Sequence, residues 1–363
     1  MKYLFQLNHP AHYHLFKNTM AQLKKDGHEI LILARPKDML IDLLKDEQYD
    51  VIQTKKGENL IQKLKKRRQV QQEILRYAEL KKPDMIIGTG DFSYVTTNLG
   101  IPSIFCGEDD ANLNIFLFLW ALTVYGNFSM ILAPQGVNNS IWNKKTTFYN
   151  GYHKLAYLHP HQFTPNPSVV EKYFPVSKPY FILRFAKLNA YHDVNSQGIN
   201  TEIADNLIRI LAPHGDVYIT SERPLEPQFE KYRLNIDPLD IHHVMFYSTL
   251  YVGDSQSMAV ESAMLGVPSI RFNDFAGKIS VLEELEHRYG LTYGIKTDNP
   301  QGLYAKVNEL LALNGLRDEF QRRKQHMLND KIDVTAFFVW LIENYPESKA
   351  ILKTNPAYPL QFK

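Results

Sequence analysis

Residues 245–273 read MFYSTLYVGDSQSMAVESAMLGVPSIRFN, and this stretch decides the fold that we expect. Its apolar run at 250–252 predicts a short buried strand, and the run at 269–272 predicts a second one. Between them, residues 258–265 predict a helix that ends at Gly266, because glycine readily adopts the left-handed conformation of a helix C-terminus. A strand–turn–helix–strand unit requires parallel strands joined by a right-handed crossover. The stretch therefore predicts an α/β fold with parallel sheets.

The turn at residues 253–257 is a candidate phosphate site. Such a turn directs free backbone N–H groups and the positive end of a helix dipole to one place. Glu261 lies one turn into the helix, where its carboxylate can accept hydrogen bonds from a ribose diol. The alternative is an ordinary βαβ unit, in which Glu261 is a surface acid that stabilises the helix dipole.

Length and composition predict two globular domains. The chain has 363 residues, of which 44% are hydrophobic, enough for two cores. A net charge of +2 gives no support for a nucleic-acid partner. The single cysteine, Cys106, excludes an intramolecular disulfide and a multi-cysteine metal site. We expect no secretory signal and a cytoplasmic protein.

Two segments raise the question of a membrane. Residues 111–143 carry no charge, and 113–125 are nearly all apolar but too few to span a bilayer. We expect a buried helix there; the alternative is a surface helix that dips into the inner face of a membrane. The second segment is a run of cations, which is a solvated helix face or a contact for anionic lipid: Lys63, Lys65, Lys66, Arg67 and Arg68.

The first half opens with a strand at 3–7 and a loop at 8–14, followed by a helix at 15–25. In a βαβ unit this loop lies at the carboxyl edge of the sheet, where open α/β folds bind ligands. Neutral histidine is available as a base near pH 7, so His12 is a candidate catalytic residue. Binding of a metal by His9, His12 and His14 is the alternative, but the loop lacks acidic ligands.

Two further loops follow strands of the first half. Gly88–Asp91 follows a strand at 83–87, and Gly107–Asp110 follows a strand at 101–105. Carboxylates and histidines at one sheet edge are suited to general acid–base catalysis, so Asp91 and Glu108 join His12 as catalytic candidates. The alternative is that the acids at 108–110 cap the next helix.

The second half repeats the strand–helix order. A strand at 180–185 precedes a loop with Asn189, Tyr191, His192 and Asp193, and a strand at 216–220 precedes Ser221–Pro224. We predict a first Rossmann-like domain at 1–165, a linker at 163–179 and a second domain at 179–335. The tail, 336–363, begins with a helix rich in aromatic residues, which we expect to cross back onto the first domain. Capping of the second domain is the alternative.

Several motifs resemble known families. Residues 253–270 resemble the donor-binding segment of GT-B glycosyltransferases, and 87–111 (IGTGDFSYVTTNLGIPSIFCGEDDA) are similar to the acceptor side of the lipid-linked peptidoglycan N-acetylglucosaminyltransferase. Over residues 1–295 the chain resembles an uncharacterised bacterial and archaeal GT-B-like family. The motifs of that family stand here as NHPAHYHLFKN, GYHKLAYLHP, ILRFAKLNAYHD, TSERPL and SMAVESAMLGVPSIRFN.

The resemblance implies a metal-independent glycosyltransferase with two Rossmann-like domains, which uses a nucleoside-diphosphate sugar, a UDP-sugar by expectation, and a glycan or lipid-linked acceptor. It implies no cofactor and a role in surface polysaccharide or glycolipid synthesis. The residues expected to bind the nucleotide are Arg184, Ser221, Arg223, Ser255, Gln256, Ser257, Met258 and Glu261. His12, or else Glu108, would be the general base. The alternatives are a non-hydrolysing nucleotide-sugar 2-epimerase, which the loops at 88–91 and 107–110 also suit, and a non-catalytic sugar-nucleotide-binding protein.

Overall fold

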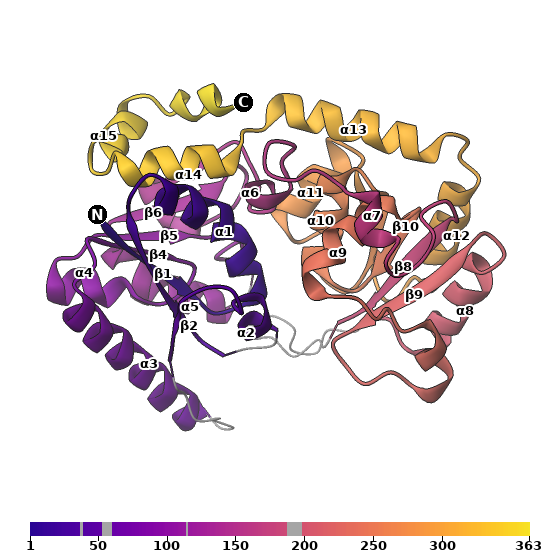
Figure 1. Cartoon of the computed structure of the whole chain (residues 1–363), viewed down its shortest axis with the longest axis horizontal. Helices are drawn as coiled ribbons and strands as arrows, with labels where there is room; N and C mark the ends of the chain where they lie inside the picture. Colours follow the sequence, from indigo (N-terminus) through magenta and orange to yellow (C-terminus); the bar gives the residue numbers. More distant parts are fainter. Residues whose placement is uncertain (37–38, 53–59, 114, 187–197) are drawn as a thin grey trace. The chain divides into compact units, whose positions relative to one another are not determined.

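The computed structural model describes residues 1–36, 39–52, 60–113, 115–186 and 198–363, with the backbone alone for 60–66. The chain divides into two compact units (Figure 1). Unit 1 comprises Met1–Gln162 and Lys331–Lys363, and unit 2 comprises Phe163–Asp330. Each unit contains one parallel sheet with flanking helices.

Unit 1 is built on a sheet with the strand order β3-β2-β1-β4-β5-β6-β7. All of its described strand pairs are parallel. The strand order reverses between β1 and β4, which makes the carboxyl ends of these two strands the switch point of the sheet. The strands are β1 (Lys2–Leu7), β2 (Glu29–Ala34), β3 (Asp50–Val51), β4 (Met85–Gly88), β5 (Ser103–Cys106), β6 (Met130–Pro134) and β7 (Thr146–Tyr149).

The helices of unit 1 come from both of its chain segments. The first segment gives α1 (Pro10–Lys25), α2 (Leu40–Leu43), α3 (Leu60–Lys81), α4 (Ser93–Leu99), α5 (Ile115–Val124), α6 (Leu155–Leu158) and the 3-10 turns η1 (Tyr125–Asn127) and η2 (Ser140–Lys145). The second gives α14 (Val334–Glu343), α15 (Glu347–Thr354) and η5 (Tyr358–Phe362). The central strands are apolar and buried, since a parallel sheet is covered on both faces.

Unit 2 has a smaller sheet with the order β12-β11-β10-β8-β9, and its order reverses between β8 and β10. The strands are β8 (Tyr180–Phe185), β9 (Asp216–Ser221), β10 (Leu250–Gly253), β11 (Ser269–Phe272) and β12 (Thr292–Ile295). The helices are α7 (Pro167–Val170), α8 (Thr201–Leu211), η3 (Pro227–Tyr232), η4 (Pro238–Asp240), α9 (Ile241–Tyr247), α10 (Gln256–Leu265), α11 (Ser280–His287), α12 (Pro300–Leu311) and α13 (Leu316–Asp330).

The stretch at 245–273 forms the strand–helix–strand unit that its sequence predicts. Helix α10 ends at Gly266, whose φ of 69° is left-handed, and β10 and β11 pair in parallel. The predicted start of the helix was wrong by two residues, because Ser255 is the N-cap and accepts a hydrogen bond from the Met258 N–H. Gln256 and Ser257 therefore lie, together with Met258, in the first turn of α10 and not in the preceding loop.

The first helix also begins earlier than predicted. Helix α1 starts at Pro10, with His9 as its N-cap, so His12 and His14 are helical and not part of a loop. Proline is favoured at the first helical position because its fixed φ suits a helix and the missing N–H has no helical partner there. The His14 ring is buried and packs against Tyr157, with ring centroids 5.2 Å apart.

The prediction of a buried helix at 113–125 was wrong. In α5 only Ala121 and Val124 are buried. Four large apolar side chains are exposed, at 60%, 56%, 52% and 40% of their surface: Ile115, Phe116, Leu119 and Leu122. No helix of the described residues is both long enough and apolar enough to cross a membrane.

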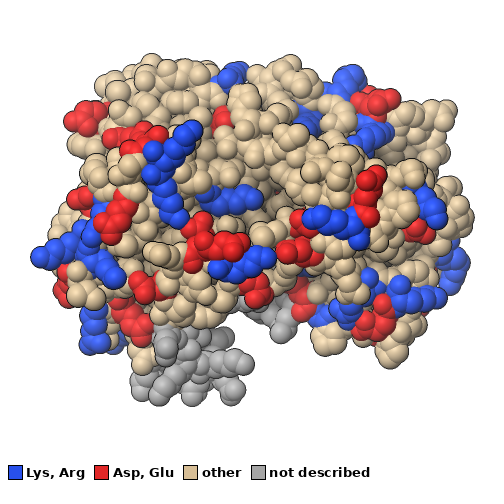
Figure 2. All heavy atoms as spheres, viewed as in Figure 1, with Lys and Arg blue, Asp and Glu red and all other residues tan. Residues whose placement is uncertain are grey.

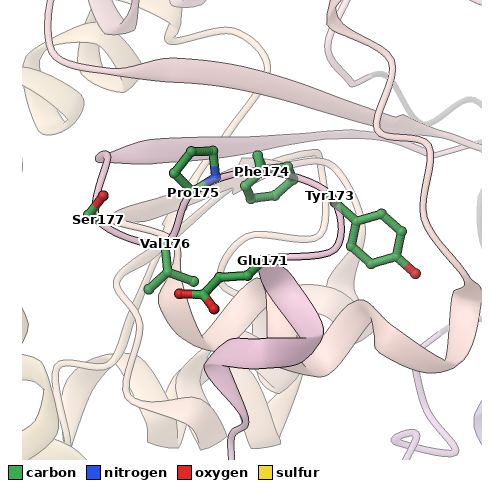
Figure 3. A pocket seen from close by; sticks show the side chains of 6 residues that line it. All are labelled: Glu171, Tyr173, Phe174, Pro175, Val176 and Ser177. Carbon is green, nitrogen blue, oxygen red and sulfur yellow. The ribbon is translucent and has the colours of Figure 1, made fainter.

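The segment at 163–179, predicted to be a linker, belongs to unit 2. It contains α7, and its Phe174 stacks on Tyr218 of β9 with ring centroids 4.3 Å apart. A hollow of about 650 Å³ lies along it, lined by Glu171, Tyr173, Phe174, Pro175, Val176 and Ser177 (Figure 3). Two groups from the sequence analysis lie outside the described residues: Asn189, Tyr191, His192 and Asp193, and the side chains of Lys63, Lys65 and Lys66.

The tail packs on unit 1, as predicted for a C-terminal helix that crosses back. Figure 1 shows α14 beside α1, and the two helices are in contact. The buried Phe338 of α14 lies between Phe16 and Tyr149, with ring centroids 6.3 and 5.6 Å away. The Thr335 hydroxyl donates to the Ala156 carbonyl at 2.6 Å. The tail therefore forms part of the core of unit 1.

Replacing Phe338 with Ala should lower the free energy of unfolding of unit 1 by about 3–5 kcal/mol, because it leaves a cavity between α14 and the sheet. Hydrogen exchange resolved by peptide is the measurement, and protection should fall in residues 1–162. The control is Leu360→Ala, since the Leu360 side chain is exposed. Protection lost only in residues 163–330 would contradict this account of the tail.

Candidate functional site

In unit 1 the two strand ends at the switch point are joined by a hydrogen bond between side chains. His12 lies in the first turn of α1, directly after β1, and Thr89 directly follows β4. The Thr89 hydroxyl lies 2.8 Å from His12 Nε2 and 2.7 Å from Nδ1. The predicted histidine therefore stands where open α/β sheets bind ligands.

His12 also takes part in capping its own helix. The Asn8 N–H donates to His12 Nδ1 at 3.1 Å, and the Ala11 N–H donates to His9 Nδ1 at 3.2 Å. A neutral imidazole that accepts at Nδ1 carries its proton on Nε2. To act as a base through Nε2, His12 needs the other tautomer, at the cost of the Asn8 hydrogen bond, about 1 kcal/mol.

The floor of this edge is closely packed. The side-chain amides of Gln6 and Asn8 bond to each other in both directions. A Cβ atom at Gly90 would displace both amides from their present positions, so the loop after β4 lies close against β1 at this glycine. The close approach of the loop to β1 keeps Thr89 within reach of His12.

Glu108 follows β5 and is held in a buried ion pair. Its carboxylate accepts a hydrogen bond from Lys154 Nζ and one from the His153 N–H at 2.8 Å. Burial by itself raises the pKa of Glu108, but Lys154 and His153 outweigh burial, so the pKa lies below its ordinary value. Burial also lowers the pKa of His153 to about 4. Glu108 is thus a weak base, and its environment favours His12 as the proton acceptor.

Asp91 is held by α3. Its Oδ2 atom accepts hydrogen bonds from Arg67 Nε at 2.7 Å and from Gln71 Nε2 at 2.9 Å. Asp110 Oδ1 accepts a hydrogen bond from the Asn138 N–H at 2.7 Å. Of the three catalytic candidates, only His12 contacts Thr89 across the switch point.

In unit 2 the switch point holds a guanidinium group. Arg184 is the last residue but one of β8, which ends at Phe185. It pairs in register with Gly253 at the end of β10. Its NH1 donates to the Thr220 hydroxyl at 2.8 Å, and its NH2 pairs with Glu222. The Arg184 Nε atom is buried and makes no hydrogen bond within the described residues.

A second guanidinium group comes from the loop after β9. Arg223 NH2 donates to the Ile199 carbonyl, and the guanidinium lies 5.3 Å from the centre of the Phe185 ring. Its Nε atom, like that of Arg184, is buried and makes no hydrogen bond among the described atoms. The predicted Ser221 instead closes its own turn, since its hydroxyl donates to the Arg223 carbonyl at 2.7 Å.

Helix α10 presents its N-terminus at the same sheet edge, because Ser255 follows β10 directly after Asp254. The backbone N–H groups of the first turn belong to Gln256, Ser257 and Met258, the last of which is bonded to the cap. Glu261 is buried, which rules out the alternative of a surface acid. Its Oε1 lies 3.4 Å from Nε2 of the buried His242 on α9.

Asp254 is a functional candidate that sequence reasoning missed. It is buried, and its carboxylate accepts from the Ala186 N–H at 2.6 Å and from the Ile199 N–H at 3.2 Å. Ala186 precedes and Ile199 follows residues 187–197, so one carboxylate joins the described chain on both sides of that segment. Burial raises the pKa of Asp254 to about 6, although the two N–H donors act in the opposite direction. The only signal in the sequence was an acid directly after a buried strand.

The predicted nucleotide residues are thus gathered at the carboxyl edge of one sheet. The hollow of Figure 3 lies elsewhere in unit 2, because residues 171–177 precede the amino end of β8. In Figure 2, acidic and basic side chains alternate over the visible face without a large area of one sign. The arrangement at β8 and β10 combines two arginines with a helix N-terminus, which suits an anionic ligand.

Comparison with solved structures shows the GT-B fold. A protein of Listeria monocytogenes provisionally assigned as a UDP-N-acetylglucosamine 2-epimerase has a TM-score of 0.70 at 15% identity, over 96% of this chain and 97% of its own. The UDP-GlcNAc 2-epimerase of Neisseria meningitidis, bound to UDP-GlcNAc, has a TM-score of 0.62 at 15% identity, over 95% of this chain and 100% of its own. Acinetobacter baumannii MurG has a TM-score of 0.56 at 15% identity, over 94% of this chain and 99% of its own.

No family model matches the chain, and no curated protein matches it. The two parallel sheets and these similarities confirm the predicted GT-B class of fold. At such low identity the similarity is one of fold, which enzymes of more than one reaction share.

The raised pKa of Asp254 predicts a pH dependence of stability. Its carboxyl binds a proton more tightly in the folded protein than at its ordinary pKa of 3.8, so ionisation destabilises the fold. The free energy of unfolding of the wild type, relative to Asp254→Asn, should fall by about 1–3 kcal/mol as the pH rises from about 4 to about 6, and then stay level. Urea denaturation at a series of pH values measures it. A difference that rises with pH would mean that the N–H donors outweigh burial.

Proposed function

We propose that this protein is a GT-B glycosyltransferase that transfers a sugar from a UDP-sugar, in the synthesis of a surface polysaccharide or glycolipid. The observation that carries the proposal is the pair of guanidinium groups of Arg184 and Arg223 at the sheet edge where α10 presents its N-terminus. Guanidinium groups and a helix N-terminus are suited to the oxygens of a diphosphate. No cofactor is required for this chemistry.

In the proposed reaction the two arginines and the first turn of α10 stabilise the diphosphate as it leaves. Charge that develops on a leaving group is stabilised best by donors already fixed in place. Arg184 is fixed by Thr220, and Arg223 by the Ile199 carbonyl. Glu261, held near His242, would accept hydrogen bonds from the ribose hydroxyls.

His12 is the proposed general base of unit 1. With the ring proton moved to Nδ1, the acceptor hydroxyl would take the place of Thr89 at Nε2, and its proton would pass to that nitrogen as the hydroxyl attacks the sugar. Glu108 and Asp91 are less suited to this role, because Lys154 and Arg67 neutralise them. Those ion pairs support a positioning role for both acids.

The second candidate is a non-hydrolysing nucleotide-sugar 2-epimerase. It is favoured by the similarity in fold to proteins described as UDP-GlcNAc 2-epimerases. Epimerisation removes and returns a proton on the sugar itself, so it needs acid and base groups around the ring. The pairing of Glu108 and Asp91 with cations weakens this candidate. A non-catalytic sugar-nucleotide-binding protein is the third.

Incubation with UDP-GlcNAc alone, followed by NMR, tests the proposal. We expect slow release of UDP with no 2-epimer, since water replaces the missing acceptor. His12→Gln should abolish this release and leave UDP affinity, measured by calorimetry, unchanged. Glu261→Gln should weaken UDP binding by about 1–3 kcal/mol, because hydrogen bonds to the ribose are lost.

The other outcomes identify the alternatives. Conversion of the sugar to its 2-epimer would establish the epimerase and overturn the transferase. An unchanged UDP-GlcNAc that still raises the melting temperature would favour the binding protein. Absence of any UDP binding would contradict the role of Arg184 and Arg223. The His287→Ala variant is the control, because this side chain is exposed and bonds only to Glu283 among the described residues.

We further propose that unit 1 meets an anionic membrane surface through α5, where a lipid-linked acceptor would be available. The exposed side chains at 115, 119 and 122 lie on one face of the helix, since residues three and four apart are neighbours. Ile141 of η2 is also exposed, at 63%. A contiguous apolar surface of this kind is typical of a contact site.

Basic side chains lie at the end of α5. Arg67 NH2 donates to the Thr123 hydroxyl of α5 at 3.3 Å. Lys145 of η2 bonds to the Gly126 carbonyl just after α5, and Lys349 is close enough to lower the pKa of Lys145 further, in addition to the effect of burial. Apolar side chains next to cations match the acyl chains and phosphates of an anionic bilayer.

The wild type should sediment with vesicles that contain phosphatidylglycerol, and less so with phosphatidylcholine alone. Replacing Phe116 and Leu119 with Ser should abolish sedimentation, because each buried apolar side chain contributes about 1.5–3 kcal/mol. The matched control is Leu80→Ser, since Leu80 is 77% exposed on α3. Equal sedimentation of the Phe116/Leu119 variant would rule out α5 as the contact. Loss of a dimer in that variant would assign the surface to a second copy of the chain.

A further inference from the structure

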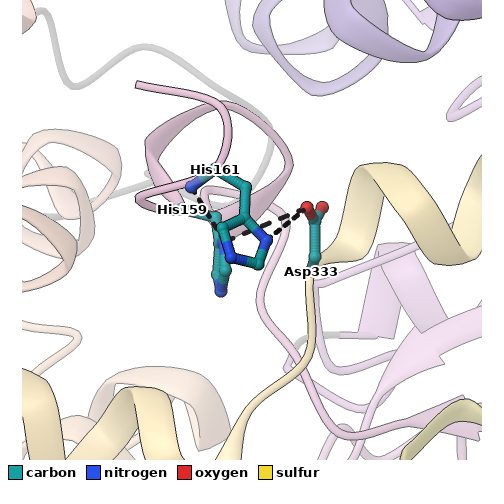
Figure 4. Close-up of side chains that lie close together, drawn as sticks. All are labelled: His159, His161 and Asp333. Atoms are coloured by element: carbon teal, nitrogen blue, oxygen red, sulfur yellow. Dashed lines mark hydrogen bonds and ion pairs between the residues drawn. The ribbon is translucent and has the colours of Figure 1, made fainter. Parts of the chain in front are cut away.

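Three potential metal ligands lie together where the chain leaves unit 1 and where it returns. His159 and His161 stand at the end of the first segment of unit 1, and Asp333 stands near the start of the second. Figure 4 shows both imidazoles directed toward the carboxylate. His159 and Asp333 are buried, whereas the side chain of His161 is 64% exposed. The cluster is therefore anchored on two sides and open to solvent on the third.

The spacing of the ligand atoms suits a small divalent cation. Asp333 Oδ2 lies 3.4 Å from His161 Nδ1 and 3.9 Å from His159 Nδ1, and one ligand atom from each residue lies within 4.8 Å of the others. Tetrahedral zinc holds nitrogen and oxygen ligands at about 2.0–2.2 Å, so its ligands stand roughly 3.4 Å apart. The His161–Asp333 pair already has that spacing, and the His159–Asp333 pair would have to close slightly from 3.9 Å.

The surrounding contacts orient two of the three ligands. Asp333 Oδ1 accepts from the Ala336 N–H at 3.1 Å as the N-cap of α14, and Gln162 Nε2 donates to Oδ2 at 2.9 Å. His159 Nδ1 accepts a long hydrogen bond, 3.3 Å, from the His161 N–H. A metal ion at this nitrogen would take the place of the His161 N–H, because a neutral imidazole has one accepting nitrogen. Such outer contacts fix the ligands of metal sites.

We propose that His159, His161 and Asp333 bind a divalent transition metal, zinc in the first place, with water as the fourth ligand. Two imidazoles and a carboxylate are the ligand types that zinc and related ions prefer, whereas magnesium and calcium prefer oxygen alone. The ion joins the end of the first segment of unit 1 to the start of α14. It acts as a structural tie for the returning tail.

This proposal is independent of the proposed function. We expected no metal site from the sequence, because the loop with His9, His12 and His14 lacks acidic ligands. Here the whole of unit 2 separates the histidines from Asp333. The expectation of a metal-independent reaction is unaffected, because no ligand of this cluster belongs to the catalytic or nucleotide candidates.

The test is titration of the full chain with zinc and cobalt after treatment with a chelator. We expect one ion per chain, a visible absorption band typical of four-coordinate cobalt, and a melting temperature that rises with zinc concentration. His161→Ala should weaken binding more than about tenfold and leave the melting temperature of the metal-free protein unchanged, because its side chain is exposed. Asp333→Asn should do the same for binding, since asparagine keeps the N-cap but lacks the charge.

The control is His287→Ala, which removes an exposed histidine paired with Glu283 in unit 2. It should bind zinc like the wild type. Absence of binding by the wild type would overturn the proposal. Equal binding by the wild type and His161→Ala would also overturn it, because the ion would then be adventitious and held elsewhere on the surface.

Discussion

Parallel strand pairing is the constraint on which both units depend. The described strand pairs of the two sheets are all parallel, so each connection must carry the chain from the carboxyl edge of the sheet back to its amino edge. The loops that follow the strands therefore meet at one edge of each sheet. Where the strand order reverses, neighbouring loops turn away from each other and leave room for a ligand. His12 and Arg184 have their places at the two reversals because of this topology.

Buried charges then fix the loops at these edges. Glu108 is held by Lys154 in unit 1, and Asp254 is held by two backbone N–H groups in unit 2. Arg271 of β11 is fully buried, and its NH2 lies 2.8 Å from Glu286. Burial lowers the pKa of Arg271, while Glu286 and Glu283 oppose that change. Removing one partner of such a pair costs about 3–5 kcal/mol, so these groups fix loop positions strongly.

The candidate site could be predicted in part. The types of residue after each strand indicated an anion-binding site in the second half of the chain and a catalytic general base in the first half. Lys154, His242 and Asp254 were not predicted, since their partners are distant in sequence or belong to the backbone. The same limit explains α5. An apolar run predicts burial only if another element covers it, and Leu119 and Leu122 are exposed.

The sequence alone determined the alternation of strands and helices, the end of α10 at Gly266, and the loops that carry chemistry. These features follow from periodicity, from glycine and proline, and from contacts within a few residues. Only the tertiary structure decided which charged groups are paired, that His12 lies beside Thr89, and that Asp333 lies beside His159 and His161. Each of these depends on groups that folding brings together from separate parts of the chain, and local sequence carries no information on that distance.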